Sequence, residues 1–585
     1  MIILSRWRSG GGEAASGASS GGRNVLGPSG AMLTNVHAAV ASGTKHVLYA
    51  AIARTGRPVA VMMRKFSIRP ALRDLCRDRG LRLAAASGAC AALSFFPLPW
   101  GLNAVLMMCA LVPLLEAAHG AGWRRGACYG AATGLTAVAI AFHWILPLIA
   151  RFSGLPLPAA FVAFAAAVAW GAVFWASWGA VWGARRAGPL LVVCAPVALE
   201  CVWPRVFRWH FGDPLVEIPA LAQISDLCGM PGRSLLVLAV NYGLWRVSLW
   251  LRGRIPFPRA AAGTALAFLA ATVAYGAVRL ALAPAPAPTL DVALVHTAIP
   301  LAEKHAALAD VMYVATAEGV TLRRGPRYLA HERELIARGK ASAAGLVVFP
   351  EAMLWVDRGE ERPRLAPEIG APVLAGSDVQ ELVAEDPRPR FYNGAILEAG
   401  GRRQFYFKHR LMPFGEEVPF GRRFPAIARL GRAAGIGMLD AGDGARVMVL
   451  DGHRLAPLIC YEVIVPEYVA EFVRQGAEVL VNVTEDGWYG WTGEPYQHLL
   501  LARSRAIENR RTLLRCVNNG ITAIVDPWGR LTAVNADPVR PGIVRGRVEL
   551  RADLTPFTRW HAWQRWGLVA AAAALALWRG RPRRA

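Results

Sequence analysis

The sequence predicts a two-part protein, in which a multi-pass α-helical membrane region is followed by an α/β domain outside the cytoplasm. The chain of 585 residues is 54% hydrophobic and only 18% charged, which is too apolar for an ordinary soluble protein. Long runs rich in Ala, Leu, Val and Trp fill residues 82–283. Residues 289–552 have the mixed composition of a globular domain. These three observations carry the prediction.

The apolar runs are near the ~20 residues that are needed to cross a bilayer core. We therefore predict a seven-span membrane domain at 82–283 and a final transmembrane helix at 564–579. The first two runs are short enough to form a shallow hairpin instead. The eight predicted spans lie at 82–98, 101–118, 127–149, 156–183, 188–204, 230–251, 260–283 and 564–579.

Arginine clusters predict the orientation of these spans. Clusters stand before the first span and after the second, fourth, sixth and eighth, so the positive-inside rule assigns that side to the cytoplasm. Arg205 and Arg208 are an exception, in a loop that this scheme places outside. The domain at 289–552 is then periplasmic, and the chain is a multi-pass protein of the bacterial inner membrane. We expect residues 1–81 to be a cytoplasmic leader that is disordered at its start, with the natural start near Met63.

The charge pattern and the cysteine spacing argue against nucleic-acid binding, a disulfide framework and a metal site. The net charge of +24 could indicate nucleic acid, but no basic and aromatic recognition pattern accompanies it. Nine cysteines are scattered without a CxxC motif, so we expect neither a disulfide framework nor a metal site. No cofactor is predicted.

Residues 289–552 show the pattern of an α/β domain. Short apolar, β-branched runs such as DVALVH, GLVVFPE, LAPLICYE and EVLVNVTED alternate with helical stretches near 304–338, 465–475 and 495–511. Strands this apolar are buried on both faces, so helices must cover the sheets.

Three reactive side chains follow predicted strands in this domain. Glu351 follows LVVFP, Lys408 lies in YFKHRLMPFGEEVPF, and Cys460 ends LAPLIC. Taken singly, a buried cysteine is usually a small hydrophobe and a lysine a solvated charge. Together they suit nucleophilic catalysis, because a thiol with a pKa near ~8.5 needs a base, and a cation stabilises the charge that develops. The ordered motifs FPE, K-x-x-L-x-P-F-G-E and ICYE make the pattern specific.

With YNGAIL at 392–397 and QHLLLARSRAIENRR at 497–511, these motifs resemble the apolipoprotein N-acyltransferase family, a membrane branch of the nitrilase superfamily. The resemblance covers residues 82–579. It implies an α-β-β-α sandwich with a triad of Glu351, Lys408 and Cys460. Further positions that the family uses to support the site are matched by Glu416, Tyr461 and Glu462.

The resemblance also implies the substrates. The acyl donor would be a phospholipid such as phosphatidylethanolamine, and the acceptor the α-amino group of the diacylglyceryl-cysteine of an apolipoprotein, both held in the membrane. A membrane-tethered amidase or nitrilase of the same superfamily is the alternative. A transporter with an accessory domain is disfavoured, because the spans show no internal repeat and few charges.

Four residues are candidates for positioning substrate. IPLAEKH places His305 where the family usually has Trp, and Glu485-Asp486 replaces an Asn-Asp pair. Trp488 and Tyr489 follow that pair and could form a lid, or else pack as an ordinary loop. Glu200 lies near the outer end of the fifth predicted span, where a carboxylate either supports a substrate site or sits at the interface.

Overall fold

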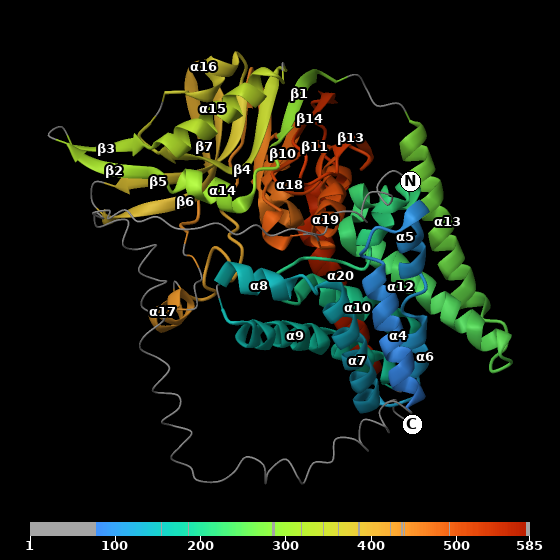
Figure 1. The fold of residues 1–585 in the computed structure, drawn as a ribbon. Coiled ribbons are helices and arrows are strands. Elements are labelled where there is room, and N and C mark those ends of the chain that lie inside the picture. Colours follow the sequence, from blue (N-terminus) through green and yellow to red (C-terminus); the bar gives the residue numbers. More distant parts are fainter. Residues whose placement is uncertain are drawn as a thin grey trace, which may run out of the picture. The chain divides into compact units, whose positions relative to one another are not determined.

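The computed structural model describes residues 78–580 except 154, 185–186, 283–286, 317–318, 343, 361, 384–385, 422, 434–436, 438 and 491. The predicted leader therefore lies outside the described residues as far as residue 77. A helical region comes first, an α/β region follows, and α20 (Pro556–Gly580) returns to the helical region (Figure 1).

The helical region is built from helices whose small residues allow close packing. A Cβ atom built on Gly126 would lie 2.2 Å from the carbonyl oxygen of Gly179, and one on Gly130 2.2 Å from that of Trp175. Contacts this close between α7 and α9 need glycine, as is common between membrane helices. The helices are α4 (Arg79–Leu93), α5 (Leu102–Met107), α6 (Val112–Ala118), α7 (Trp123–Ala141), α8 (Ile145–Ser153), α9 (Leu157–Gly183), α10 (Pro189–Val202), α11 (Pro219–Ala222), α12 (Ser225–Leu251) and α13 (Arg259–Ala281).

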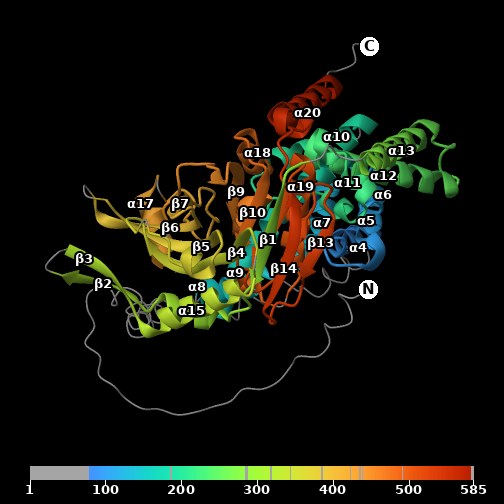
Figure 2. The ribbon, with the colours of Figure 1, turned by 90° about the horizontal axis from the view of Figure 1, so that it is seen from above.

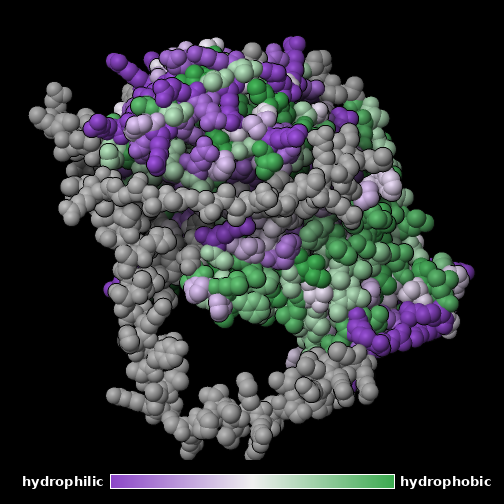
Figure 3. Space-filling model, viewed as in Figure 1, coloured by the Kyte–Doolittle hydropathy of each residue, from purple (hydrophilic) through white to green (hydrophobic). Residues whose placement is uncertain are grey.

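Four helical segments of the described chain are long and apolar enough to cross a membrane: Pro99–Ala118, Leu157–Gly183, Ser225–Leu251 and Arg259–Ala281. Trp123–Ala141 and Ile145–Arg151 form a pair bent by 56° that would make a fifth. The other predicted spans coincide with α4, α10 and α20, which are not among these segments. Several apolar helices are thus present. On the face seen in Figure 3, apolar residues gather over them and polar residues over the α/β region.

The α/β region contains two six-stranded sheets. Their strand orders are β14-β1-β4-β5-β6-β7 and β13-β12-β11-β10-β9-β8. Strands β1, β4 and β5 are parallel neighbours in the first sheet, as are β9, β10 and β11 in the second. The strands are β1 (Thr289–His296), β4 (Leu346–Asp357), β5 (Val373–Val383), β6 (Asp386–Ala399), β7 (Arg402–Phe407), β8 (Met448–Leu450), β9 (His453–Ile459), β10 (Val479–Thr484), β11 (Thr512–Val517), β12 (Thr522–Val525), β13 (Leu531–Asn535) and β14 (Gly542–Glu549).

The two sheets pack face to face and helices cover their outer sides (Figure 2). One buried cluster joins side chains of both sheets, such as Leu294 and Leu458, with Phe472 of α18 and Ala502 of α19. A second cluster packs Leu335 of α15 on the first sheet. This is the predicted nitrilase-like α-β-β-α sandwich. Its helices are α14 (Leu301–Leu308), α15 (Pro326–Lys340), α16 (Leu365–Ile369), α18 (Pro466–Arg474) and α19 (Glu494–Asn509). A further helix, α17 (Pro425–Ala433), lies away from the two sheets (Figure 1).

The continuous helical stretch predicted near 304–338 is wrong. Helix α14 ends at Leu308, and an antiparallel hairpin of β2 (Val311–Thr316) and β3 (Gly319–Arg324) precedes α15. The residues of the hairpin explain the break, because Val, Tyr and Thr favour strands over helix. Gly325 and Pro326 then begin α15, where proline suits the first helical turn.

Candidate active site

Two strand ends and the irregular middle of a third strand bring the predicted triad together. Glu351 does not follow its strand as predicted, because β4 continues past it to Asp357. Glu351 lies within β4, Lys408 directly follows β7, and Cys460 directly follows β9. The first two strands belong to one sheet and the third to the other. All three side chains line the same cavity, so residues that are 109 positions apart in the sequence (351 to 460) share one space.

Glu351 and Lys408 belong to a buried polar network. The Lys408 ammonium lies 3.6 Å from Oε1 of Glu351 and 2.8 Å from Oε1 of Glu416. The amide nitrogen of Asn393 donates to Oε1 of Glu351 at 2.7 Å and to Oε1 of Glu416 at 2.9 Å. Burial alone would lower the pKa of Lys408, but Glu416 and then Glu351 hold it above its usual range. Lys408 is therefore a permanent cation between two carboxylates.

Burial raises the pKa of Glu351, and Lys408 opposes that shift. A carboxyl group poised in this way is better matched to taking and returning a proton near neutral pH than a solvated one. Backbone geometry helps to direct it, because the residue after it, Ala352, has a φ of 52° and the pairing of β4 with β5 is irregular there.

Cys460 sits at a sharp turn from strand to helix. Its φ is 48°, in the left-handed region that a non-glycine residue rarely adopts, and it opens the short 3₁₀ helix η4 (Cys460–Ile464). The pKa of the thiol is raised well above its ordinary value by burial and then by Glu351, whereas Lys408 lowers it. The resting group is thus a thiol, so deprotonation requires a nearby base.

Glu462 links the cysteine turn to the lysine segment. Its Oε1 accepts hydrogen bonds from Tyr406 Oη at 2.7 Å and from the backbone N–H groups of His409 and Arg410. Its Oε2 accepts the N–H of Ile459 at 2.9 Å. Burial raises the pKa of Glu462 to about 7. Because it bonds residues flanking both Cys460 and Lys408, it holds the two segments in register.

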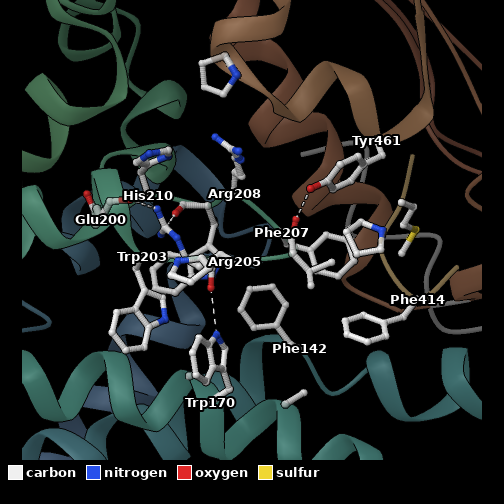
Figure 4. Close-up of a pocket in the computed structure, with 18 of the residues that line it drawn as sticks. Phe142, Trp170, Glu200, Trp203, Arg205, Phe207, Arg208, His210, Phe414 and Tyr461 are labelled. Carbon is white, nitrogen blue, oxygen red and sulfur yellow. Dashed lines mark hydrogen bonds between the residues drawn. The ribbon is translucent and has the colours of Figure 1, made fainter. Parts of the chain in front are cut away.

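Tyr461 joins the site to the helical region. Its hydroxyl donates to the carbonyl oxygen of Val206 at 2.6 Å, and its ring packs edge-on against Phe207 at 6.5 Å (Figure 4). Val206 follows α10, so the residue after the cysteine is anchored to a loop of the helical region.

A single cavity of about 1240 Å³ extends from the predicted triad into the helical region. Its walls there are apolar and aromatic, and Phe142, Trp170, Phe207 and Phe414 surround it in Figure 4. Glu200 also lines it and is 2% exposed. One carboxylate oxygen of Glu200 accepts the N–H of Phe211 at 2.9 Å.

The predicted lid residues take different places. Tyr489 is buried and packs edge-on against Trp144 at 5.1 Å, while Trp488 also lines the cavity. Both lie in the 3₁₀ helix η5 (Gly487–Tyr489). His305 is exposed on α14, and its ring lies 5.2 Å from that of Trp488. His305 thus reaches the cavity only through Trp488.

Two residues of this region were not singled out from the sequence. Asn393 lies in the quoted YNGAIL segment, but nothing local indicated that its amide would bridge two carboxylates. Lys304 is buried, with its ammonium 2.5 Å from Oε2 of Glu485 and 3.4 Å from the carbonyl oxygen of Glu351. A lysine beside an exposed histidine resembles a solvated charge, so only the fold shows that it is buried.

Within the described part of the chain, one buried group could geometrically hold a cation. Ligand atoms of Asp486, Glu494 and His498 lie within 4.8 Å of one another. Asp486 already pairs with Arg515 at 2.7 Å and with His498 at 3.2 Å. The guanidinium supplies the positive charge that a metal would bring, so we interpret the group as an ion-pair network.

Comparison with known proteins assigns both regions. Residues 87–243 match the model of the apolipoprotein N-acyltransferase N-terminal domain, and residues 314–551 match that of carbon-nitrogen hydrolases. An apolipoprotein N-acyltransferase of Geobacter metallireducens is 30% identical over 86% of this chain and 96% of its own length. The chain belongs to the apolipoprotein N-acyltransferase family.

A second family member and a solved structure are also similar to this chain. The apolipoprotein N-acyltransferase of Azotobacter vinelandii is 31% identical over 86% of this chain and 96% of its own length. Among solved structures, an amidase from Nesterenkonia sp. AN1 aligns with 47% of this chain and 99% of its own at 19% identity, with a TM-score of 0.30. The two family models cover parts of both the helical region and the α/β region.

Proposed function

We propose that this chain transfers a fatty acyl group from a phospholipid, through a thioester on Cys460, to the α-amino group of an N-terminal diacylglyceryl-cysteine. The observation that carries the proposal is the single cavity, which is lined by Glu351, Lys408 and Cys460 at one end and by apolar side chains of the helical region at the other. A lipid chain can lie among the helices while its ester reaches the thiol.

In the first half-reaction, the carboxylate of Glu351 takes the proton of the Cys460 thiol and the sulfur attacks the ester carbonyl carbon. Lys408 and nearby backbone N–H groups stabilise the oxyanion. The bond from the carbonyl carbon to the glycerol oxygen then breaks, and Glu351 returns the proton to that oxygen. A lysophospholipid leaves and the acyl group remains on sulfur.

In the second half-reaction, the acceptor amine attacks the thioester carbonyl carbon. Glu351 takes a proton from the amine, the carbon–sulfur bond breaks, and the proton passes to the sulfur. An amide forms and the thiol is restored. Glu416 and Asn393 keep Lys408 and Glu351 in place during both steps, and Glu462 and Tyr461 hold the cysteine turn.

The cavity favours a lipid over the small substrates of an amidase. Its volume of about 1240 Å³ exceeds the ~300–1,000 Å³ of ordinary small-molecule sites. Most side chains that line it in the helical region are apolar or aromatic, which suits an acyl chain better than a small amide. We therefore rank the membrane-tethered amidase second.

The proposal includes the predicted topology, in which eight spans hold the domain at 289–552 in the periplasm of a bacterial inner-membrane protein. Helices α4, α10 and α20 would then complete the membrane domain beside the longer segments. A periplasm-specific reporter fused near residue 400 is expected to be active, and a silent fusion would contradict this topology.

The function is tested by running the half-reactions separately. Purified protein given phosphatidylethanolamine alone is expected to gain the mass of one acyl chain, sensitive to hydroxylamine, and to release lysophospholipid. A peptide with an N-terminal diacylglyceryl-cysteine should then remove the label and emerge N-acylated. Release of free fatty acid, with no acylated peptide, would instead support a hydrolase.

A further inference from the structure

The cavity also carries a group of arginines that the proposed chemistry at Cys460 does not use. Arg205 and Arg208 lie in the loop after α10, and Arg565 lies in α20. All three line the cavity, together with Glu467 of α18. In Figure 4, Arg205 and Arg208 stand between Glu200 and His210 on one side and Phe207 and Tyr461 on the other. Charged side chains are thus concentrated in one part of a largely apolar space.

The charges in this group are not balanced. Arg208 pairs with Glu467, and Arg565 lies 3.8 Å from the same carboxylate oxygen. Two guanidinium groups therefore share one carboxylate. Their side chains remain 38% and 35% exposed, so they retain faces that are free to meet a ligand.

Arg205 adds a third cation, whose hydrogen bonds go to neutral acceptors and whose charge Glu200 offsets from a longer distance. It donates to the carbonyl oxygens of Trp209 and Glu200, and its guanidinium lies over the rings of Phe174 and Trp209 at 5.6 and 5.4 Å. Among the described residues, no carboxylate lies within 4.0 Å of this guanidinium. These contacts orient the guanidinium. With Glu200 and Glu467 counted, three arginines face two carboxylates in this part of the cavity.

Tyr461 relates this group to the nucleophile. It directly follows Cys460 and its hydroxyl bonds the carbonyl of Val206, two residues before Arg208. Glu467, the shared partner, lies at the start of α18, which closely follows the cysteine turn. The cations are therefore tied to the same short segment as the thiol.

We propose that Arg208 and Arg565, supported by Arg205, bind the phosphate of the glycerophospholipid whose ester is presented to Cys460. The planar fork of a guanidinium matches phosphate oxygens, and the pairing is strongest where water is excluded. In a phospholipid the phosphate and the acyl esters are attached to one glycerol. One cavity that contains both an anion site and a thiol can therefore bind the phosphate and place an ester at the thiol. When the lipid enters, its phosphate takes the place of Glu467 on the arginines.

This inference rests on the proposed function, so its test separates binding from catalysis. The Cys460→Ala variant, which cannot be acylated, is mixed in detergent with phosphatidylethanolamine or with diacylglycerol of the same chains. Native mass spectrometry then measures the retained lipid. Adding Arg208→Gln and Arg565→Gln together should weaken phospholipid binding about tenfold or more, the scale of lost charged hydrogen bonds, and leave diacylglycerol binding unchanged.

Matched variants sharpen the result. Arg254→Gln removes an exposed arginine that pairs with Glu116 away from the cavity, and it should bind both lipids like the parent. Arg208→Lys keeps the charge but loses the fork, so its affinity should fall between the parent and Arg208→Gln. Equal loss of phospholipid and diacylglycerol in the double variant would show a packing role and overturn the inference.

Free phosphate is the other source of the same chemistry. Inorganic phosphate at millimolar concentration should compete weakly with phosphatidylethanolamine, because it lacks the chains that fill the apolar walls. If inorganic phosphate binds to the arginines but the protein retains no phospholipid, the lipid assignment is overturned. If the double variant loses phospholipid binding while unsubstituted protein never forms an acyl adduct, the phosphate site stands and the proposed function fails.

Discussion

Cys460 and Cys516 are both buried cysteines of the second sheet, yet their surroundings differ. The pKa of each thiol is raised well above the ordinary value, with burial as the largest cause. Cys516 lies within β11, where its sulfur is 3.2 and 3.5 Å from the carbonyl oxygens of Val348 and Val295. Cys460 lies beyond its strand at a φ of 48° and lines the cavity with Glu351 and Lys408. Burial alone therefore does not make a reactive thiol, because reaction also needs a base, a cation and access.

Removing each sulfur in turn tests the difference between the two cysteines, and it is expected to give the largest effect. Cys460→Ala is expected to abolish both the acyl adduct and transfer to the peptide, because no other group can form the thioester. Cys516→Ala should keep activity near that of unsubstituted protein, since its thiol lies in the buried core and its described hydrogen bonds go to carbonyl oxygens. Intact-protein mass spectrometry after incubation with phosphatidylethanolamine measures both. An adduct that maps to Cys516, or transfer that persists in Cys460→Ala, would contradict the mechanism.

The charged partners of Cys460 come next in expected effect. Glu351→Gln and Lys408→Met should each lower kcat/KM by about 10²–10⁴-fold, because proton transfer and oxyanion stabilisation each contribute on that scale. Circular dichroism should show a folded protein.

Lys340 and Glu368 provide a matched control. Their charges are also 3.6 Å apart, but the pair is more than half exposed. Lys340→Met and Glu368→Gln should leave activity unchanged, because an exposed pair contributes little. Activity within tenfold of unsubstituted protein in Glu351→Gln would remove that residue from the mechanism.

The dependence of activity on pH tests the role of Glu351 as a base, and its expected effect is smaller than that of substituting the residue. The carboxylate must be unprotonated to take the thiol proton, and burial raises its pKa. Activity should therefore fall as the pH drops through this raised pKa, above the ~4.3 of an ordinary glutamate. The hydrogen bond from Asn393 lowers the pKa, so Asn393→Ala should move the acid limb of kcat/KM to higher pH.

Gln404→Ala is the control for that shift. Gln404 also carries an amide, but its side chain bonds only the backbone of Val449 among the described partners. The acid limb should stay where it is in unsubstituted protein. An unmoved limb in Asn393→Ala would show that the amide does not tune Glu351.

The smallest expected effect concerns His305. We expect His305→Trp to preserve or raise acyl transfer and His305→Ala to lower it modestly, because a planar ring there packs against Trp488, 5.2 Å away. Initial rates of peptide acylation at several phospholipid concentrations measure this. Full activity of His305→Ala would show that the ring is dispensable.

The sequence by itself determined the class of the protein and singled out three side chains that the fold brings into one cavity. Apolar runs, β-branched strands and the motifs around Glu351, Lys408 and Cys460 are local signals, so they can be read without the fold. They also predicted the family, which the comparisons confirm. The local pattern did not predict the hairpin at Val311–Arg324 within the helical stretch expected near 304–338. Short strands and helices are hard to separate by local pattern.

Only the tertiary structure decided which side chains lie together around these residues. Asn393 bridges Glu351 and Glu416 because β6 lies beside β5 in the sheet, and Lys304 is buried because Glu485 from the other half of the domain meets it. The cavity likewise needs the loop after α10 and helix α20 to close around α18. These hydrogen bonds and ion pairs join residues that are 23 to 181 positions apart. Their energies depend on burial and distance, which no local pattern of residues records.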